Sequence, residues 1–281
     1  RFWDMRKPEV IDYLSEKVIG LLNHYGFEYM KIDYNDTIGI GCDGAESLGE
    51  GLRQNMEASV HFIEKIKENV PGIILENCAS GGHKLEPEMM GRTAMASFSD
   101  AHECEEIPVI AANLHRVILP RQSQIWAVIR ESDSTQRIVY SVAAGLLGRL
   151  CLSGDVTHLT KEQWDAIDRG ITFYKKAAPI IRDGVSHLGG TKLKSWRHLE
   201  GWQSVFRETE KEALVVIHTF AGELPENLEI DLGEDGNYTI ADRYCDEADL
   251  SVVETAKAES GKLICRSFGN WKAAAFLLKR C

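Results

Sequence analysis

Two residues of opposite charge, Lys31 and Asp33, stand two positions apart in the otherwise mostly apolar run YMKIDYND, residues 29–36. On a β-strand, successive side chains point to opposite faces, so these two side chains would share one face. A neighbouring cation keeps a carboxylate ionised, and a lysine can also hydrogen-bond sugar hydroxyls. The pair is therefore a candidate for chemistry. A buried ion pair, or a surface lysine on an edge strand, would produce the same pattern.

Polar side chains also follow the other predicted strands. In parallel α/β proteins, functional groups gather at the carboxyl ends of the strands. Two aspartates, Asp33 and Asp100, end strands that would lie two apart in the sheet. Paired carboxylates across a pocket are typical of glycoside hydrolysis. The complete set of strand-end candidates is Asp33, Asn35, Glu76, Asn77, Cys78, Ser99, Asp100, His102, Arg121, Gln122 and Asp155.

Structural explanations compete with each of these candidates. An aspartate at a strand end often caps the following helix, and a free cysteine such as Cys78 is often a small core residue. His102 fits an ordinary solvated loop, and Arg121 fits a helix surface. The segment ASGGH lacks the spacing of a phosphate-binding loop, and its glycines suit a close approach of backbone to a ligand.

The hydrophobic pattern predicts the elements that must position these groups. Helices are expected over residues 10–25, 48–69, 109–117 and 138–147, and a long helix is expected to begin after Thr160, with Gln163 completing a capping box. Strands are expected at residues 27–33, 73–77, 93–100 and 148–155. This alternation predicts a parallel α/β sheet, open or closed into a barrel, with roughly six strand–helix units.

The hydrophobic pattern changes after residue 183. Short strand-like runs separated by turns follow, which predicts a small antiparallel sandwich. The sequence therefore predicts a catalytic (β/α) barrel portion over residues 1–183 and a C-terminal β-sandwich domain over residues 184–281.

Composition excludes several classes of function. The 281 residues carry a net charge of −11 without a basic run, which argues against nucleic acid or an anionic membrane as partner. No apolar run reaches the roughly 18 residues of a membrane span, and no signal peptide is visible. The seven cysteines are scattered without a CxxC pair, which argues against a zinc site or a disulfide framework and favours a reducing cytoplasm.

The ordered motifs resemble those of glycoside hydrolase family 36, the α-galactosidases or melibiases. Five segments carry the resemblance across essentially the whole chain: DMRKPEVIDYL, YMKIDYN, ENCASGGHKLEP, SFSDAHE and LTKEQW. The family pattern has Trp where this chain has Ile32, Trp where it has Ser97, and Arg where it has Lys84. We expect these differences to alter the outer sugar subsites.

The resemblance implies a (β/α)8 barrel with a C-terminal sandwich that hydrolyses terminal α-galactosides with retention, without a metal or organic cofactor. Asp33 takes the position of the nucleophile and Asp100 that of the general acid/base. Lys31, Asn35, Cys78 and Gly81 fall on sugar-binding positions, and four further candidates for the pocket are Asn77, Lys84, His102 and Arg121. An α-N-acetylgalactosaminidase, a galactosyl-transferring relative and a non-catalytic sugar-binding or scaffold protein remain open alternatives.

Family members carry a β-sandwich and the first barrel strands ahead of the segment that matches RFWDMRKPEV here. We therefore expect an incomplete barrel with bare sheet edges and an exposed apolar patch. The expectation is a truncated chain that self-associates or binds a missing N-terminal segment, and that alone binds galactosides poorly and turns them over slowly or, as an inactive fragment, not at all.

Overall fold

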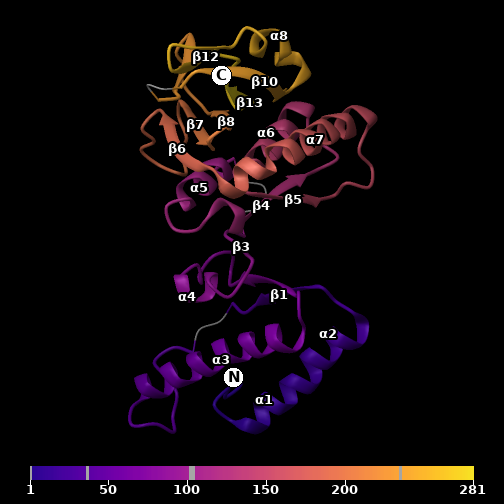
Figure 1. Ribbon diagram of the computed structural model, residues 1–281, viewed down its shortest axis with the longest axis vertical. Coiled ribbons are helices and arrows are strands. Elements are labelled where there is room, and N and C mark those ends of the chain that lie inside the picture. The colour runs from indigo at the N-terminus through magenta and orange to yellow at the C-terminus, as the bar shows by residue number, and fades with distance from the viewer. Residues whose placement is uncertain (1, 36–37, 101–104, 234–235) are drawn as a thin grey trace. The chain divides into compact units, whose positions relative to one another are not determined.

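The computed structural model describes residues 2–35, 38–100, 105–233 and 236–281. The chain divides into two compact units, residues 1–100 and residues 101–281, and each is described by itself (Figure 1). No helix in the described residues is long and apolar enough to cross a membrane.

The first unit begins with one helical rod. It comprises α1 (Pro8–Leu14), the π-helical turns of η1 (Ser15–Ile19) and α2 (Gly20–Tyr25). Pro8 occupies the first turn, where its missing N–H costs nothing, and Gly26 ends the rod with a φ of +67°. The helix predicted over residues 10–25 is confirmed. The second predicted helix is α3 (Leu48–Asn69), where the Ser47 side chain accepts a hydrogen bond from the N–H of Glu50.

Three parallel strands complete the first unit, in the order β1 (Tyr29–Asp33), β2 (Ile74–Cys78) and β3 (Met95–Ser97). The short helix α4 (Pro87–Met90) connects the last two strands. One face of the strands packs against α3 and the helical rod, as Figure 1 shows. The buried residues of this layer are Ile19, Leu22, Val60, Ile63, Ile66, Val70, Leu75 and Met89.

The second unit continues the strand–helix pattern. Its elements are α5 (Ile107–Leu114), η2 (Pro120–Gln122), β4 (Ser123–Ile129), α6 (Thr135–Gly145), β5 (Arg149–Gly154) and α7 (Lys161–Asp183). β4 and β5 pair in parallel. The predicted capping box is confirmed: the Thr160 hydroxyl accepts from the Gln163 N–H, and the Gln163 side chain accepts from the Thr160 N–H.

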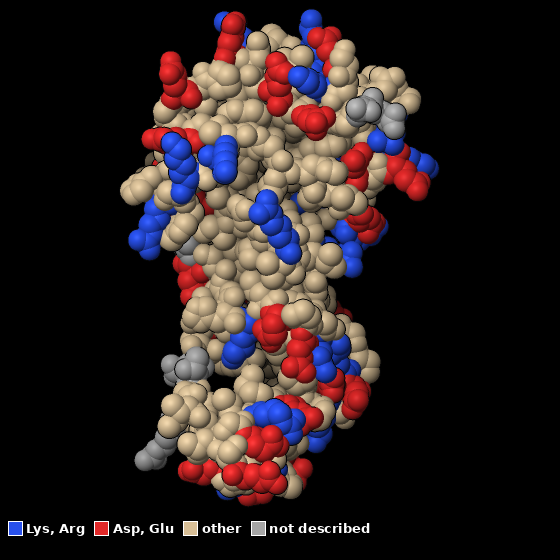
Figure 2. All heavy atoms as spheres, turned by 90° about the vertical axis from the view of Figure 1, so that its left-hand side faces the viewer, with Lys and Arg blue, Asp and Glu red and all other residues tan. Residues whose placement is uncertain are grey.

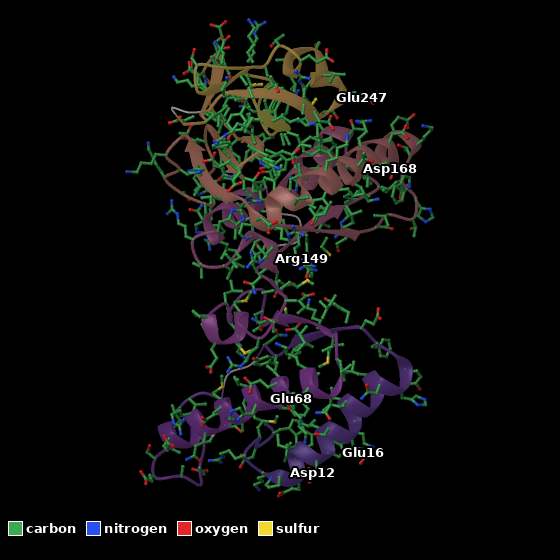
Figure 3. All side chains as sticks on the ribbon, in the orientation of Figure 1. Asp12, Glu16, Glu68, Arg149, Asp168 and Glu247 are labelled. Carbon is green, nitrogen blue, oxygen red and sulfur yellow. The ribbon has the colours of Figure 1, made fainter. Side chains whose placement is uncertain are left out.

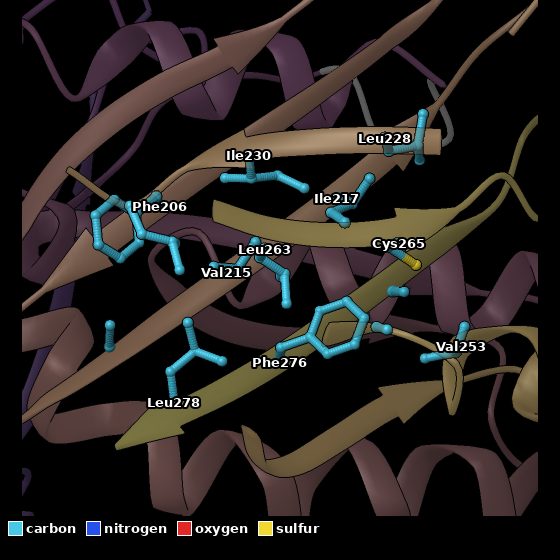
Figure 4. Packing of buried hydrophobic residues seen from close by; sticks show 14 of the residues in the cluster. Phe206, Val215, Ile217, Leu228, Ile230, Val253, Leu263, Cys265, Phe276 and Leu278 are labelled. Carbon is cyan, nitrogen blue, oxygen red and sulfur yellow. The ribbon is translucent and has the colours of Figure 1, made fainter. Parts of the chain in front are cut away.

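Antiparallel strands fill the rest of the second unit. One sheet has the order β10-β13-β8-β7-β6 and the other the order β11-β12-β9. Their bounds are β6 Val185–Gly190, β7 Trp202–Glu208, β8 Glu212–Thr219, β9 Asn227–Asp231, β10 Tyr238–Cys245, β11 Lys257–Glu259, β12 Lys262–Arg266 and β13 Ala273–Arg280. Phe206 and Phe276 of the first sheet share a buried cluster with Leu263 of the second (Figure 4). The short strand-like runs separated by turns thus correctly predicted antiparallel strands in this part of the chain.

On the face that Figure 2 shows, acidic and basic side chains are interspersed among the drawn residues. The exposed carboxylates Asp12, Glu16 and Glu68 lie on the polar sides of their helices in the first unit (Figure 3). In the second unit, Glu247 of η3 (Glu247–Asp249), which precedes α8 (Leu250–Val253), pairs with Arg169 of α7 at 2.7 Å.

One expectation about the fold needs correction. The described residues contain five parallel strands rather than about six, because residues 2–7 form turns and coil instead of the end of a strand. A domain boundary after residue 183 stays a prediction, since the division into compact units falls at Asp100.

Candidate active site

The polar row on β1 and β2 is built by strand register. Lys31 is the Cα partner of Glu76, and Asp33 is the partner of Cys78. Because side chains alternate, these four residues share the face of the sheet opposite to α3, whereas Met30 and Ile32 pack against the helices. The predicted juxtaposition of Lys31 and Asp33 is therefore realised in the structure, with Asp33 exposed at the strand end.

Cys78 lies against Asp33 and is only 2% exposed. Burial raises the pKa of its thiol, the Gly81 N–H and the Lys31 charge lower it, and the Asp33 charge together with a hydrogen bond to Asp33 raises it further. The net direction is upward, so the thiol stays protonated at neutral pH. Cys78 is thus a neutral thiol beside Asp33 in this arrangement.

The loop after β2 brings backbone groups to the same place. Ser80 has a φ of +44°, an unfavourable conformation for a residue with a side chain, and its N–H donates to Asn35 Oδ1 at 2.7 Å. Gly81 follows with a φ of +65°. A Cβ on Gly81 would overlap the backbone nitrogen of Asp100 and the carbonyl carbon of Ser99. Only glycine permits this approach.

The close approach places Asp100 next to the loop that contacts Cys78. β3 is two strands away from β1 in the sheet, as the sequence predicted for the strands that precede Asp33 and Asp100. Both aspartates are exposed. The structure thus brings Asp33, Cys78, Gly81 and Asp100 into one neighbourhood at the carboxyl ends of the strands.

Two of the further candidates point elsewhere. Asn77 faces the helical side of β2, is 1% exposed, and donates from Nδ2 to the carbonyl of Lys84. The Lys84 ammonium lies 3.0 Å from the centroid of the Tyr34 ring, which also belongs to the helical side. These residues fix the loop over residues 78–84 rather than line the face that carries Asp33.

Arg121 differs from its predicted position. β4 begins at Ser123, so Arg121 precedes the strand and stands at its amino end, opposite to the end expected for a site residue. Its Nη1 donates to the carbonyl of Arg182 at 3.3 Å, which ties η2 to the end of α7. His102 lies outside the described residues.

Sequence analysis named Glu76 among the strand-end candidates but missed the polar cluster that it forms near Asp33. Glu76 is 1% exposed, and its carboxylate accepts hydrogen bonds from Ser97 Oγ at 2.6 Å and from the Tyr29 hydroxyl. Lys31 Nζ lies 3.5 Å from Glu76 Oε1. A glutamate within the apolar segment IILENC was the available signal. In the part of the chain that the structure describes, no group of three or more His, Cys, Asp or Glu side chains could hold a metal ion.

The fold and these groups define a parallel α/β protein with a polar site at the carboxyl ends of its strands, joined to antiparallel sheets. The profile of the Melibiase family matches residues 1–184, and the chain belongs to this family. The resemblance seen in the motifs is therefore confirmed.

Curated relatives are α-galactosidases of which the chain spans a minor part. The Escherichia coli α-galactosidase is 25% identical over 182 residues, which cover 63% of this chain and 25% of that protein. α-Galactosidase Mel36A of Lactobacillus acidophilus is 20% identical over 229 residues, which cover 79% of this chain and 31% of that protein. The chain thus spans about a quarter to a third of these relatives.

Solved structures share the fold over almost the whole chain. A variant of the family 36 α-galactosidase AgaA from Geobacillus stearothermophilus, in complex with 1-deoxygalactonojirimycin, superposes with a TM-score of 0.78 at 17% identity, covering 99% of this chain and 39% of that one. Another AgaA variant, in complex with raffinose, superposes with a TM-score of 0.76 at 18% identity, covering 99% of this chain and 39% of that one.

Proposed function

We propose that the chain carries the catalytic carboxylates of a retaining glycosidase that cleaves terminal α-galactosides, with Asp33 as nucleophile and Asp100 as general acid/base. The neighbourhood of Asp33, the Cys78 thiol, Gly81 and Asp100 is the observation that supports this assignment most directly. Membership of the Melibiase family and the α-galactosidase relatives support the substrate class.

The proposed reaction has two displacements. In the first, an Asp33 oxygen attacks the anomeric carbon, the glycosidic C–O bond breaks, and the protonated Asp100 gives its proton to the leaving oxygen. In the second, the Asp100 carboxylate takes a proton from water, the water oxygen attacks the anomeric carbon, and the bond to Asp33 breaks. Two inversions give net retention, which requires the carboxyl groups to be about 5–5.5 Å apart.

Neighbouring groups have defined tasks in this proposal. Lys31 supplies positive charge on the same strand face as Asp33. The protonated thiol of Cys78 lies across the ladder from the same carboxylate. Asn35 uses its Oδ1 to hold Ser80, so its amide nitrogen is the group that would donate to a sugar hydroxyl.

The finer architecture belongs to the same proposal. We infer that the parallel strands are part of a (β/α)8 barrel, supported by the superposition on AgaA. Self-association, binding of an N-terminal segment and a cytoplasmic location stay predictions.

Hydrolysis of p-nitrophenyl α-galactoside tests the proposal, with β-galactoside and α-N-acetylgalactosaminide as competing substrates. Asp33→Ala should lower kcat by about a thousandfold or more, and azide should restore turnover as β-galactosyl azide. Asp12→Ala is the matched control, because Asp12 is an exposed carboxylate on α1. Unchanged activity in Asp33→Ala would refute the nucleophile assignment, and preference for another glycoside would refute the substrate class.

A further inference from the structure

The buried carboxylate of Glu76 is the feature that the proposed reaction leaves unused. Its side chain is 1% exposed, in the middle of the three parallel strands of the first unit. Burying an ionised carboxylate costs several kcal/mol unless partners compensate. Here the partners come from both neighbouring strands: Ser97 donates to Oε1 at 2.6 Å, and the Tyr29 hydroxyl donates to Oε2. Glu76 is thus enclosed by protein and does not face a ligand.

The third partner links this cluster to the reaction. Lys31 Nζ lies 3.5 Å from Glu76 Oε1, across the ladder in which these two residues are Cα partners. Asp33 lies on the same face of the same strand, two residues further toward the carboxyl end than Lys31. Lys31 therefore has a buried carboxylate on one side and the exposed carboxylate of Asp33 on the other.

We propose that Glu76 is a positioning residue that holds the Lys31 ammonium, charged and fixed in direction, beside Asp33. The role of Lys31 in catalysis rests on the proposed function, whereas the placement of Lys31 by Glu76 does not. Glu76 itself touches neither substrate nor reacting atoms.

Charge distinguishes this role from simple filling of the interior. Burial lowers the pKa of Lys31, but the charges of Glu76 and Asp33 and a hydrogen bond to Glu76 raise it, with a contribution from Cys78 where its thiol is ionised, and the net direction is upward. Tyr29 also stands on this face of β1. Replacing Glu76 by neutral glutamine keeps the shape and an acceptor for Ser97 but removes the charge. Lys31 should then release its proton at lower pH.

The rate of acetylation of Lys31 measures this change in its pKa without any substrate. The Lys31 side chain is 31% exposed, so acetic anhydride can reach it, and only the unprotonated amine reacts. At about pH 9, Glu76→Gln should raise the rate at Lys31 about threefold or more, since one pKa unit changes the unprotonated fraction about tenfold. Glu64→Gln is the matched control, because Glu64 pairs with Arg92 at 2.9 Å in the same unit. It should leave the rate at Lys31 unchanged.

An unchanged rate at Lys31 in a folded Glu76→Gln variant would overturn the proposal. If that variant does not fold, Glu76→Asp decides, because the shorter side chain keeps the charge but withdraws it from Lys31. The rate should then rise by a smaller factor, and no rise overturns the proposal. Ser97→Ala should leave the rate within about twofold of the parent, since it removes a donor but no charge.

Turnover separates this inference from the proposed function. Glu76→Gln should lower kcat/KM by about tenfold to a hundredfold and move the alkaline limb of its pH profile to lower pH. A variant with a lower melting temperature but an unmoved limb would indicate a structural role alone and overturn the positioning role. If Asp33→Ala leaves the turnover of α-galactoside unchanged while acetylation of Lys31 responds as expected, the proposed function fails and the placement of Lys31 by Glu76 stands.

Discussion

Replacement of Gly81 by alanine tests the close approach on which the candidate site depends. Gly81 has a φ of +65°, and a Cβ there would overlap the backbone of Ser99 and Asp100. Gly26 offers a matched control in the same unit. Its φ is +67°, and a Cβ there would meet nothing within 4 Å. The two substitutions therefore share the cost of the left-handed conformation, and only Gly81→Ala adds the overlap.

The shared cost is about 1 kcal/mol, the usual penalty for a Cβ in the left-handed region. The overlap cannot be relieved by a rotamer change, because the atoms that it meets are backbone. Forcing such atoms apart costs about 1–3 kcal/mol more. We expect Gly26→Ala to lower the free energy of unfolding by about 1 kcal/mol, and Gly81→Ala to lower it by about 2–4 kcal/mol.

Urea denaturation of both variants, followed by near-UV circular dichroism, measures this difference. Hydrolysis of p-nitrophenyl α-galactoside is the second measurement and gives kcat/KM for both variants. Displacement of Asp100 by about 1 Å should lower kcat/KM by about a hundredfold in Gly81→Ala, and Gly26→Ala should leave it near the parent value. Equal loss of stability in the two variants would refute the close approach between Gly81 and Asp100.

Three further predictions concern other parts of the chain. Thr160→Ala removes the cap of α7 and should lower the free energy of unfolding by about 1 kcal/mol, whereas Thr160→Ser should keep most of it; equal losses in urea titrations would contradict the capping box. The buried Cys78, whose thiol pKa burial raises, should react with Ellman's reagent more slowly than the exposed Cys281, and mass spectrometry of the labelled peptides would reveal the reverse order. Burial lowers the pKa of His218 to about 4, so the unfolded chain binds more protons below about pH 6.5, and this residue alone should lower the free energy of unfolding by about 2 kcal/mol from pH 7.5 to pH 5. This fall should be smaller in His218→Gln, and an identical pH dependence of its urea midpoint would show that other groups cause it.

Most elements of the fold followed from local patterns. The 3.6-residue periodicity predicted α3, and the pair of Thr160 and Gln163 predicted the start of α7. Both predictions succeeded because helix caps and amphipathic faces depend on residues that are close in the sequence. The limits of β3 were less predictable. The apolar run suggested eight residues, but the strand covers only Met95–Ser97 and pairs with β2 at Met95 and Ala96, since hydrogen bonds to a neighbouring strand decide where a strand ends.

The site was predictable where it depends on alternation along one strand. Lys31 and Asp33 had to share a face once β1 formed. The side-chain directions of Asn77 and Lys84 could not be predicted, because they depend on the register of β2 and on the path of the loop after it. The partners of Glu76 could not be predicted either. Tyr29 and Ser97 are 47 and 21 residues away in the chain, so no spacing rule connects them to Glu76.

Two carboxylates share a face of the sheet with Lys31, and their surroundings suit them to the two proposed roles. Glu76 is 1% exposed and receives hydrogen bonds from two hydroxyls in addition to the nearby ammonium, so its oxygens are engaged by protein. Asp33 is exposed at the strand end, with the Cys78 thiol as its neighbour across the ladder. A nucleophile must present an oxygen to the substrate, and a positioning group must not. Environment therefore favours Asp33 for attack and Glu76 for support, although both carboxylates share one face of the sheet with the same lysine.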